Sequence, residues 1–142
     1  MKKHSLVMLI VTLVGLSVYV GCSSDFTTPP DGSTISCRGG ETATGGTGSL
    51  IGVTATVKNQ QGNLASNVAV TVLKKGAINS FTLRDNITQA TLPNQFVTQS
   101  DGRGLVTVDI VNCTSSASGS SACTVEFNLG AVNCSTTLTV SQ

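Results

Sequence analysis

The sequence contains no tryptophan, and its only tyrosine and only histidine, Tyr19 and His4, lie within the first 20 residues. The rest of the chain therefore lacks the imidazole that activates the nucleophile in Ser-His and Cys-His pairs. It also lacks the Trp and Tyr rings that commonly stack on the faces of sugars. These absences argue against the common nucleophilic hydrolases and against a carbohydrate-stacking module.

Charged residues are also few, at 11% of the 142 residues. After residue 22 the chain carries six basic and seven acidic side chains, which leaves a net charge of −1 and no basic stripe. A protein that neutralises nucleic-acid phosphates needs clustered Lys and Arg. We therefore expect no nucleic-acid partner, and the scarcity of titratable groups leads us to expect no enzymatic activity.

The N-terminus has the parts of an export signal: a basic start with Lys2 and Lys3, an apolar run over residues 5–20, and the small residue Gly21. The 16-residue run is shorter than the roughly 20 apolar residues of a permanent membrane span. We expect residues 1–21 to be a signal peptide. An ordinary secretory signal that is cut nearby and an uncleaved anchor are the alternatives.

The segment Tyr19-Val20-Gly21-Cys22 resembles the end of a bacterial lipoprotein signal and matches that family at its last three positions. The resemblance implies that Cys22 becomes the lipidated first residue of the mature protein. Two acyl chains already hold a protein stably in a membrane, and Ser23 after the cysteine implies the outer membrane. Residues 22–32 are then expected to be the lipidated cysteine and a polar tether with two prolines.

Four cysteines follow Cys22: Cys37, Cys113, Cys123 and Cys134. An even number in an exported chain favours disulfides, and the close Cys-x2-Cys pairs of zinc sites are absent. Of the three possible connectivities we favour Cys113–Cys123, because the segment between them is small, polar and flexible. Cys37–Cys134 would then join the first strand to the last. We expect no metal and no cofactor.

From residue 51 onward, apolar residues recur at every second position between turn sequences, which is typical of an all-β sandwich. The Gly-rich segment 38–48 is expected to be a loop, and 95–99 a short strand. The residues expected to face the core are Ile51, Val53, Ala55, Val57, Val68, Val70, Val72, Val106, Val108, Ile110, Cys123, Val125, Phe127, Leu129, Val132, Cys134, Thr136, Leu138 and Val140.

The segments 53–63 (VTATVKNQQGN), 68–72 (VAVTV) and 98–108 (TQSDGRGLVTV) resemble bacterial Ig-like domains of the invasin/intimin type. In that family a strand ends in Asp-x-x-Gly, and here Asn59 takes the place of the Asp. The resemblance implies an Ig-like β-sandwich of about seven strands over residues 33–142. The family's domains usually occur in tandem as stalks or adhesive tips, whereas this chain has a single copy.

Three classes of function remain open at this point: an interaction module, a surface adhesin, and an enzyme or inhibitor with an unrecognised site. Asp101 with Asp109 is a candidate carboxylate pair, and Ser100-Asp101-Gly102 and Asp85-Asn86 are candidate Ca²⁺ sites. We interpret these residues as solvated turn or strand-edge residues. We therefore expect a non-catalytic, membrane-anchored Ig-like module of the cell envelope, with an envelope protein as its partner.

Overall fold

The computed structural model describes residues 27–76, 81–117 and 119–142, so Cys22 and the expected signal peptide lie outside the described residues. The four-stranded sheet contains, in spatial order, β1 (Thr34–Cys37), β3 (Thr47–Lys58), β7 (Leu105–Thr114) and β5 (Thr82–Asp85). The five-stranded sheet contains β2 (Glu41–Thr44), β9 (Val132–Ser141), β8 (Ser121–Leu129), β4 (Ala69–Gly76) and β6 (Gln95–Gln99). No helix in these ranges is long and apolar enough to cross a membrane.

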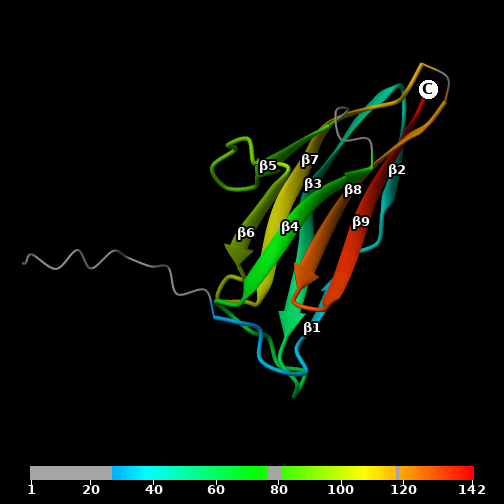
Figure 1. Cartoon of the computed structure of the whole chain (residues 1–142). Helices are drawn as coiled ribbons and strands as arrows, with labels where there is room; N and C mark the ends of the chain where they lie inside the picture. Colours follow the sequence, from blue (N-terminus) through cyan, green and yellow to red (C-terminus); the bar gives the residue numbers. More distant parts are fainter. Residues whose placement is uncertain (1–26, 77–80, 118) are drawn as a thin grey trace, which may run out of the picture.

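The two sheets pack face to face as an Ig-like β-sandwich (Figure 1). In spatial order, β1, β3, β7 and β5 correspond to strands A, B, E and D of an Ig domain, and β4, β8 and β9 correspond to C, F and G. The expected all-β Ig-like fold is thus confirmed. The sandwich has nine strands and not seven because β2 and β6 extend the five-stranded sheet at its two edges.

The prediction of a loop over residues 38–48 is wrong at the centre of this segment. Residues 41–44 form β2, which pairs in parallel with β9 from Leu138 to Ser141. Four polar or small residues are too few to show a two-residue period. Their strand conformation depends on hydrogen bonds to β9, a partner almost 100 residues away in the chain.

The core follows the expected alternation along most strands. Val70 and Val108, at the centres of two inward faces, are 0% and 2% exposed. Two expected core positions differ: Ile51 is 56% exposed and Val132 is 42% exposed. Val132 begins β9 directly after the hairpin turn at Gly130, at the end of the strand and away from its buried centre.

A bulge in β3 explains the exposure of Ile51. The register between β3 and β7 shifts between Leu50 and Val53, and Gly52 between them has a φ of +71°. An extra residue in one strand reverses the faces of the side chains beyond it. Leu50 therefore packs against the core while Ile51 points to solvent.

Both disulfides cross from one sheet to the other. Cys37 in β1 is bonded to Cys134 in β9, with 5.6 Å between their Cα atoms, and Cys113 in β7 is bonded to Cys123 in β8, at 6.1 Å. This is the connectivity favoured from the sequence. The first bridge spans 97 residues and the second spans 10. Each bridge therefore links the two sheets covalently.

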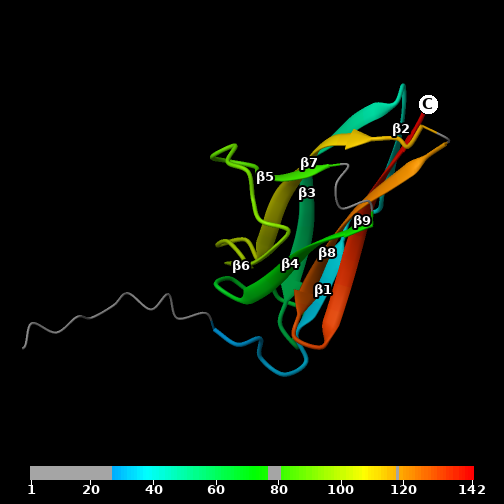
Figure 2. The ribbon, with the colours of Figure 1, turned by 45° about the horizontal axis from the view of Figure 1, so that its top comes forward.

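The chain contacts the sandwich from Thr27 onward. Thr27 forms a parallel bridge with Val68, and its side-chain hydroxyl donates to the carbonyl of Asn67. We call this end of the sandwich the tether end. The C-terminus lies at the opposite end (Figures 1 and 2), where Ser141 accepts hydrogen bonds from Gly45 and Gly46. We call this the free end.

Candidate functional site

The candidate site is a groove between the two sheets, on the side where β5 and β6 form their outer edges. Its volume is about 290 Å³, at the lower limit of the roughly 300–1,000 Å³ that is usual for small-molecule sites. A space of this size accepts one or two side chains of a partner more readily than a drug-sized substrate. We call it the β5–β6 groove.

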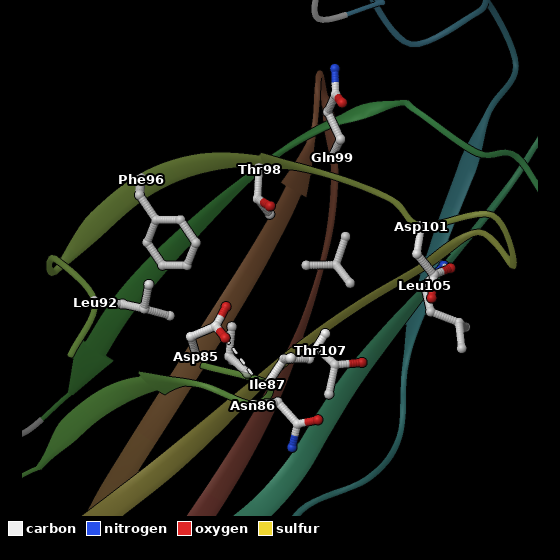
Figure 3. Close-up of a pocket in the computed structure, with 12 residues that line it drawn as sticks. Asp85, Asn86, Ile87, Leu92, Phe96, Thr98, Gln99, Asp101, Leu105 and Thr107 are labelled. Carbon is white, nitrogen blue, oxygen red and sulfur yellow. Dashed lines mark hydrogen bonds between the residues drawn. The ribbon is translucent and has the colours of Figure 1, made fainter. Parts of the chain in front are cut away.

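The β5–β6 groove has an apolar floor and acidic ends. Leu92, Phe96, Val106 and Val108 are among its apolar lining residues. Figure 3 shows Leu92 and Phe96 together at one end with Asp85 beside them, whereas Asp101 and Leu105 lie at the other end. A ligand that fills this groove therefore meets apolar surface along its length and a carboxylate near each end.

The outer edge of β6 forms one rim of the groove. Lys74 N donates to the Asn94 carbonyl, and Ser100 N donates to the Val68 carbonyl, so residues 94 and 100 point their backbone groups toward β4. In an antiparallel pair this orientation alternates along the strand. The N–H and C=O groups of Gln95 and Val97 therefore point outward. The Val97 side chain is 50% exposed.

The other rim of the groove, at β5, is covered by its own chain. Asp85 N donates to the Ala90 carbonyl and Leu92 N donates to the Leu83 carbonyl, at 2.8 and 2.9 Å. Arg84 pairs with Thr91 as an isolated bridge. The outward carbonyl of Leu83 and N–H of Asp85 are thus already used, whereas β6 has strand pairing on one side only.

A one-turn loop after β5 presents Asp85 to the groove. Its Oδ1 accepts hydrogen bonds from Ile87 N and from both the backbone and the hydroxyl of Thr88. These bonds, with the backbone of Thr88 the largest cause, hold the pKa of Asp85 below its usual value. The carboxylate is therefore ionised at neutral pH.

Asp101 stands in a five-residue turn whose hydrogen bonds recur at Asn59. In both turns the side-chain Oδ1 accepts from the backbone N–H groups two and four residues later, and the N–H three residues later donates to the first carbonyl. Gly62 and Gly104 occupy the fourth position with φ of +81° and +70°. The N–H of Leu105 is the largest cause that keeps the pKa of Asp101 lowered.

The interpretation of Asp109 as a solvated strand-edge residue is wrong. It points from the outer face of the four-stranded sheet but is 0% exposed. Its carboxylate accepts from Gly52 N at 2.8 Å, Asn86 Nδ2 at 2.9 Å and an Arg84 guanidinium nitrogen at 3.2 Å. Burial raises the pKa of Asp109, but these bonds and the Arg84 charge lower it more, so the net shift is downward.

The hydrogen bonds of Asp109 hold together the strands that form one wall of the groove, on the outer face of the four-stranded sheet. Gly52 is the bulge residue of β3, and Arg84 and Asn86 lie at the end of β5, so one carboxylate joins three strands. Figure 3 shows the side chains of Asp85 and Asn86 pointing to opposite sides. The same short segment therefore faces the groove with Asp85 and is fixed to the sheet through Asn86. Asp101 and Asp109 serve separate structures and form no catalytic pair.

The side chain of Lys74 lies against Phe81. Its ammonium donates to the Phe81 carbonyl and lies 4.5 Å from the centre of the Phe81 ring. Burial lowers the pKa of Lys74. The neighbouring Lys75 instead points outward and pairs with Glu126 at 3.6 Å. Strand alternation thus separates the two lysines onto opposite faces.

Within residues 27–76, 81–117 and 119–142, no cluster of three or more His, Cys, Asp or Glu residues is arranged to hold a metal ion. The candidate Ca²⁺ positions at Asp85 and Asp101 direct an oxygen to backbone N–H groups in turns. The chain matches no family model, no curated protein and no solved structure.

Proposed function

We propose that this chain is a non-catalytic, lipid-anchored Ig-like interaction module of the bacterial cell envelope, with another envelope protein as its partner. The observation that carries the proposal is the entry of the chain into the domain. Thr27 stands five residues after Cys22 in the sequence, and it is already bound to Asn67 and Ala69. Five residues span at most about 18 Å.

This short connection supports a domain held close to the membrane at its tether end. β3 has 12 residues, which at about 3.3 Å each extend for about 40 Å. The reach suits contact with a neighbour in the same envelope better than contact with another cell. The adhesin alternative would require the free end to extend well beyond the membrane on further domains.

The non-catalytic part of the proposal rests on what the carboxylates already do. Asp85 and Asp101 accept hydrogen bonds in turns, and Asp109 accepts bonds from two other strands. The chain after residue 22 has no histidine. Turnover of a substrate by the purified protein that a single carboxylate substitution abolishes would overturn this part.

Lipidation is tested by Cys22→Ala. We expect the wild-type protein in the detergent phase after Triton X-114 partition and the variant in the aqueous phase, since the acyl chains supply the membrane affinity. As a control, mass spectrometry determines whether the signal peptide has been removed from the Cys22→Ala protein. Unchanged partition with an intact N-terminus would identify an uncleaved anchor instead.

The orientation on the membrane is tested with single tryptophans, because the sequence has none of its own. Ala131→Trp places the probe on the hairpin beside the entering chain, and Ser116→Trp places it at the free end. In vesicles with brominated lipids we expect stronger quenching at residue 131. Stronger quenching at residue 116 would reverse the orientation that we propose.

A further inference from the structure

We propose that the β5–β6 groove binds an extended segment of the partner protein, which adds a strand to the outer edge of β6 and carries basic residues at both ends of an apolar centre. The inference rests on the proposed interaction function and names the surface and the chemistry of the partner. β-Strand addition is a common mode of peptide recognition, in which the backbone supplies affinity and pockets for alternate side chains supply specificity.

The backbone of β6 favours strand addition at this edge over the other three sheet edges in the described part of the chain. β6 is the longest of the four edge strands, with five residues against four in β1, β2 and β5. It contains no charged residue and no proline, which are common means of blocking an edge. β5 is covered by residues 90–92, and Arg38 follows β1 while Glu41 begins β2.

The size of the groove fits side chains of an added strand. Phe96 and Thr98 line it from β6 itself, and Val106 and Val108 line it from β7. Alternate residues of an added strand would point the same way as these β6 side chains. A volume of about 290 Å³ accepts one or two of them.

The charge of the groove selects a basic partner. Asp85 and Asp101 are both ionised at neutral pH, and no salt bridge is formed by either carboxylate among the described residues, although the charge of Arg103 also helps to lower the pKa of Asp101. Every hydrogen bond described for these two carboxylates falls on Oδ1. Oδ2 of each is left to accept from a Lys or Arg of the partner.

A second copy of this chain fits the groove less well. Two β6 edges in antiparallel contact would bring Asp85 and Asp101 of one copy toward the same carboxylates of the other. The β6 sequence also supplies no cation, since it reads QFVTQ. Like charges at such a contact are unfavourable, so we commit to a different, basic chain.

The probe is the acetylated peptide Lys-Thr-Leu-Thr-Leu-Thr-Lys, whose lysines and leucines share one face when it is extended. Its seven residues match the run from Asn94 to Ser100 along β6. Binding to the full chain in a nonionic detergent is measured by fluorescence anisotropy, with amide shifts of β6 by NMR. We expect saturable binding that weakens with salt, and at least tenfold weaker binding when Glu replaces both lysines.

Two edge variants test the backbone contact. Val97→Pro removes an outward N–H and leaves the bonds to β4, since proline is tolerated on the free side of an edge strand. We expect at least tenfold weaker peptide binding. Val97→Thr keeps the N–H and is expected to bind within twofold of wild type. Equal binding by Val97→Pro and wild type would overturn strand addition.

Variants that remove or relocate the carboxylate charges test the role of Asp85 and Asp101. Asp85→Asn with Asp101→Asn keeps the acceptor oxygens of both turns, as Asn59 does in the matching turn, and is expected to weaken binding about three- to tenfold. The control combines Asp101→Asn with Asn59→Asp, which keeps the net charge but moves one carboxylate out of the groove. Its binding should match that of Asp101→Asn alone. Wild-type affinity in the control would show attraction by net charge only.

Two further outcomes would overturn the groove assignment without touching the proposed function. The first is that the wild-type protein shows no peptide binding. The second is that sedimentation detects a dimer of the wild-type protein and that Val97→Pro abolishes this dimer. Failure of lipidation at Cys22 would instead overturn the anchored module while leaving peptide binding unchanged.

Discussion

Asp101 and Asp109 stand eight positions apart and both accept several hydrogen bonds, but their partners are of different kinds. The partners of Asp101 are backbone groups of Arg103 and Leu105, within four residues. Those of Asp109 come from Gly52, Arg84 and Asn86, which are 23 to 57 residues away. Asp101 shapes one turn, whereas Asp109 joins three strands.

The difference shows how the same side chain acts at two levels of structure. A local turn is encoded within five residues and survives with Asn in place of Asp, as residues 59–63 show. The long-range network exists only when β3, β5 and β7 are already adjacent. Breaking the long-range ties should therefore cost more free energy of unfolding than breaking the local ones.

The two disulfides give the largest test of this contrast. On the loop-entropy argument, removing the bridge of 97 residues with Cys37→Ala/Cys134→Ala should lower the free energy of unfolding by about 4–5 kcal/mol, and removing the bridge of 10 residues by about 3 kcal/mol. Urea unfolding of the two double variants measures both losses. A larger loss from the short bridge would contradict the ranking.

Asp109→Ala should lower the free energy of unfolding by about 3 kcal/mol, because it leaves the Gly52 N–H and the Arg84 guanidinium without their buried acceptor. Thr107→Ala, on the same face of β7, is the control and should cost less than about 1 kcal/mol. Chemical denaturation at pH 7 compares them. Equal losses for the two variants would mean that the Asp109 network contributes no more to the free energy of unfolding than the one hydrogen bond between the hydroxyls of Thr54 and Thr107.

Gly104→Ala and Gly62→Ala compare the two matching turns. Both have positive φ, so each alanine should cost about 1 kcal/mol in backbone strain. A Cβ at residue 104 would also lie 2.8 Å from the Val57 carbonyl oxygen, whereas nothing lies within 4 Å of one at residue 62. We expect a total loss of about 2–3 kcal/mol at Gly104. Similar thermal midpoints for the two variants would contradict this difference.

Asp101→Asn gives the smallest effect and depends on pH. The folded pKa of Asp101 is lowered, so its ionised form stabilises the fold above the unfolded pKa of about 3.9, and this contribution is lost as pH falls through the folded pKa. The variant should be slightly less stable than wild type at pH 7, and the two should converge below about pH 4. Parallel stability curves from pH 7 to pH 2 would refute the assignment.

The sequence predicts the layers of this fold well because a two-residue period is a local signal. Val70, Val108 and Phe127 are buried as that period requires. Ile51 breaks it at a bulge whose position is set by the partner strand β7. β2 and the network of Asp109 were missed for a related reason: each depends on a neighbour that only the folded chain supplies.

The groove could be found in the sequence only in part. The pattern of residues 95–99 predicts a short strand, and Ser100 to Gly104 predicts a turn. Nothing local shows that β6 lies at an edge or that Asp85 and Asp101 face one groove. A conspicuous signal was available at Asp85, where an Asp three residues before a Thr is typical of a side chain that caps the following turn.

The bridge between Cys37 and Cys134 closes most of the domain into a covalent ring. β3 to β8, and with them the whole β5–β6 groove, lie inside this ring. A load applied between the tether and a bound partner would therefore be carried by two backbone paths at once. A single proteolytic cut anywhere in the ring would leave both fragments covalently joined.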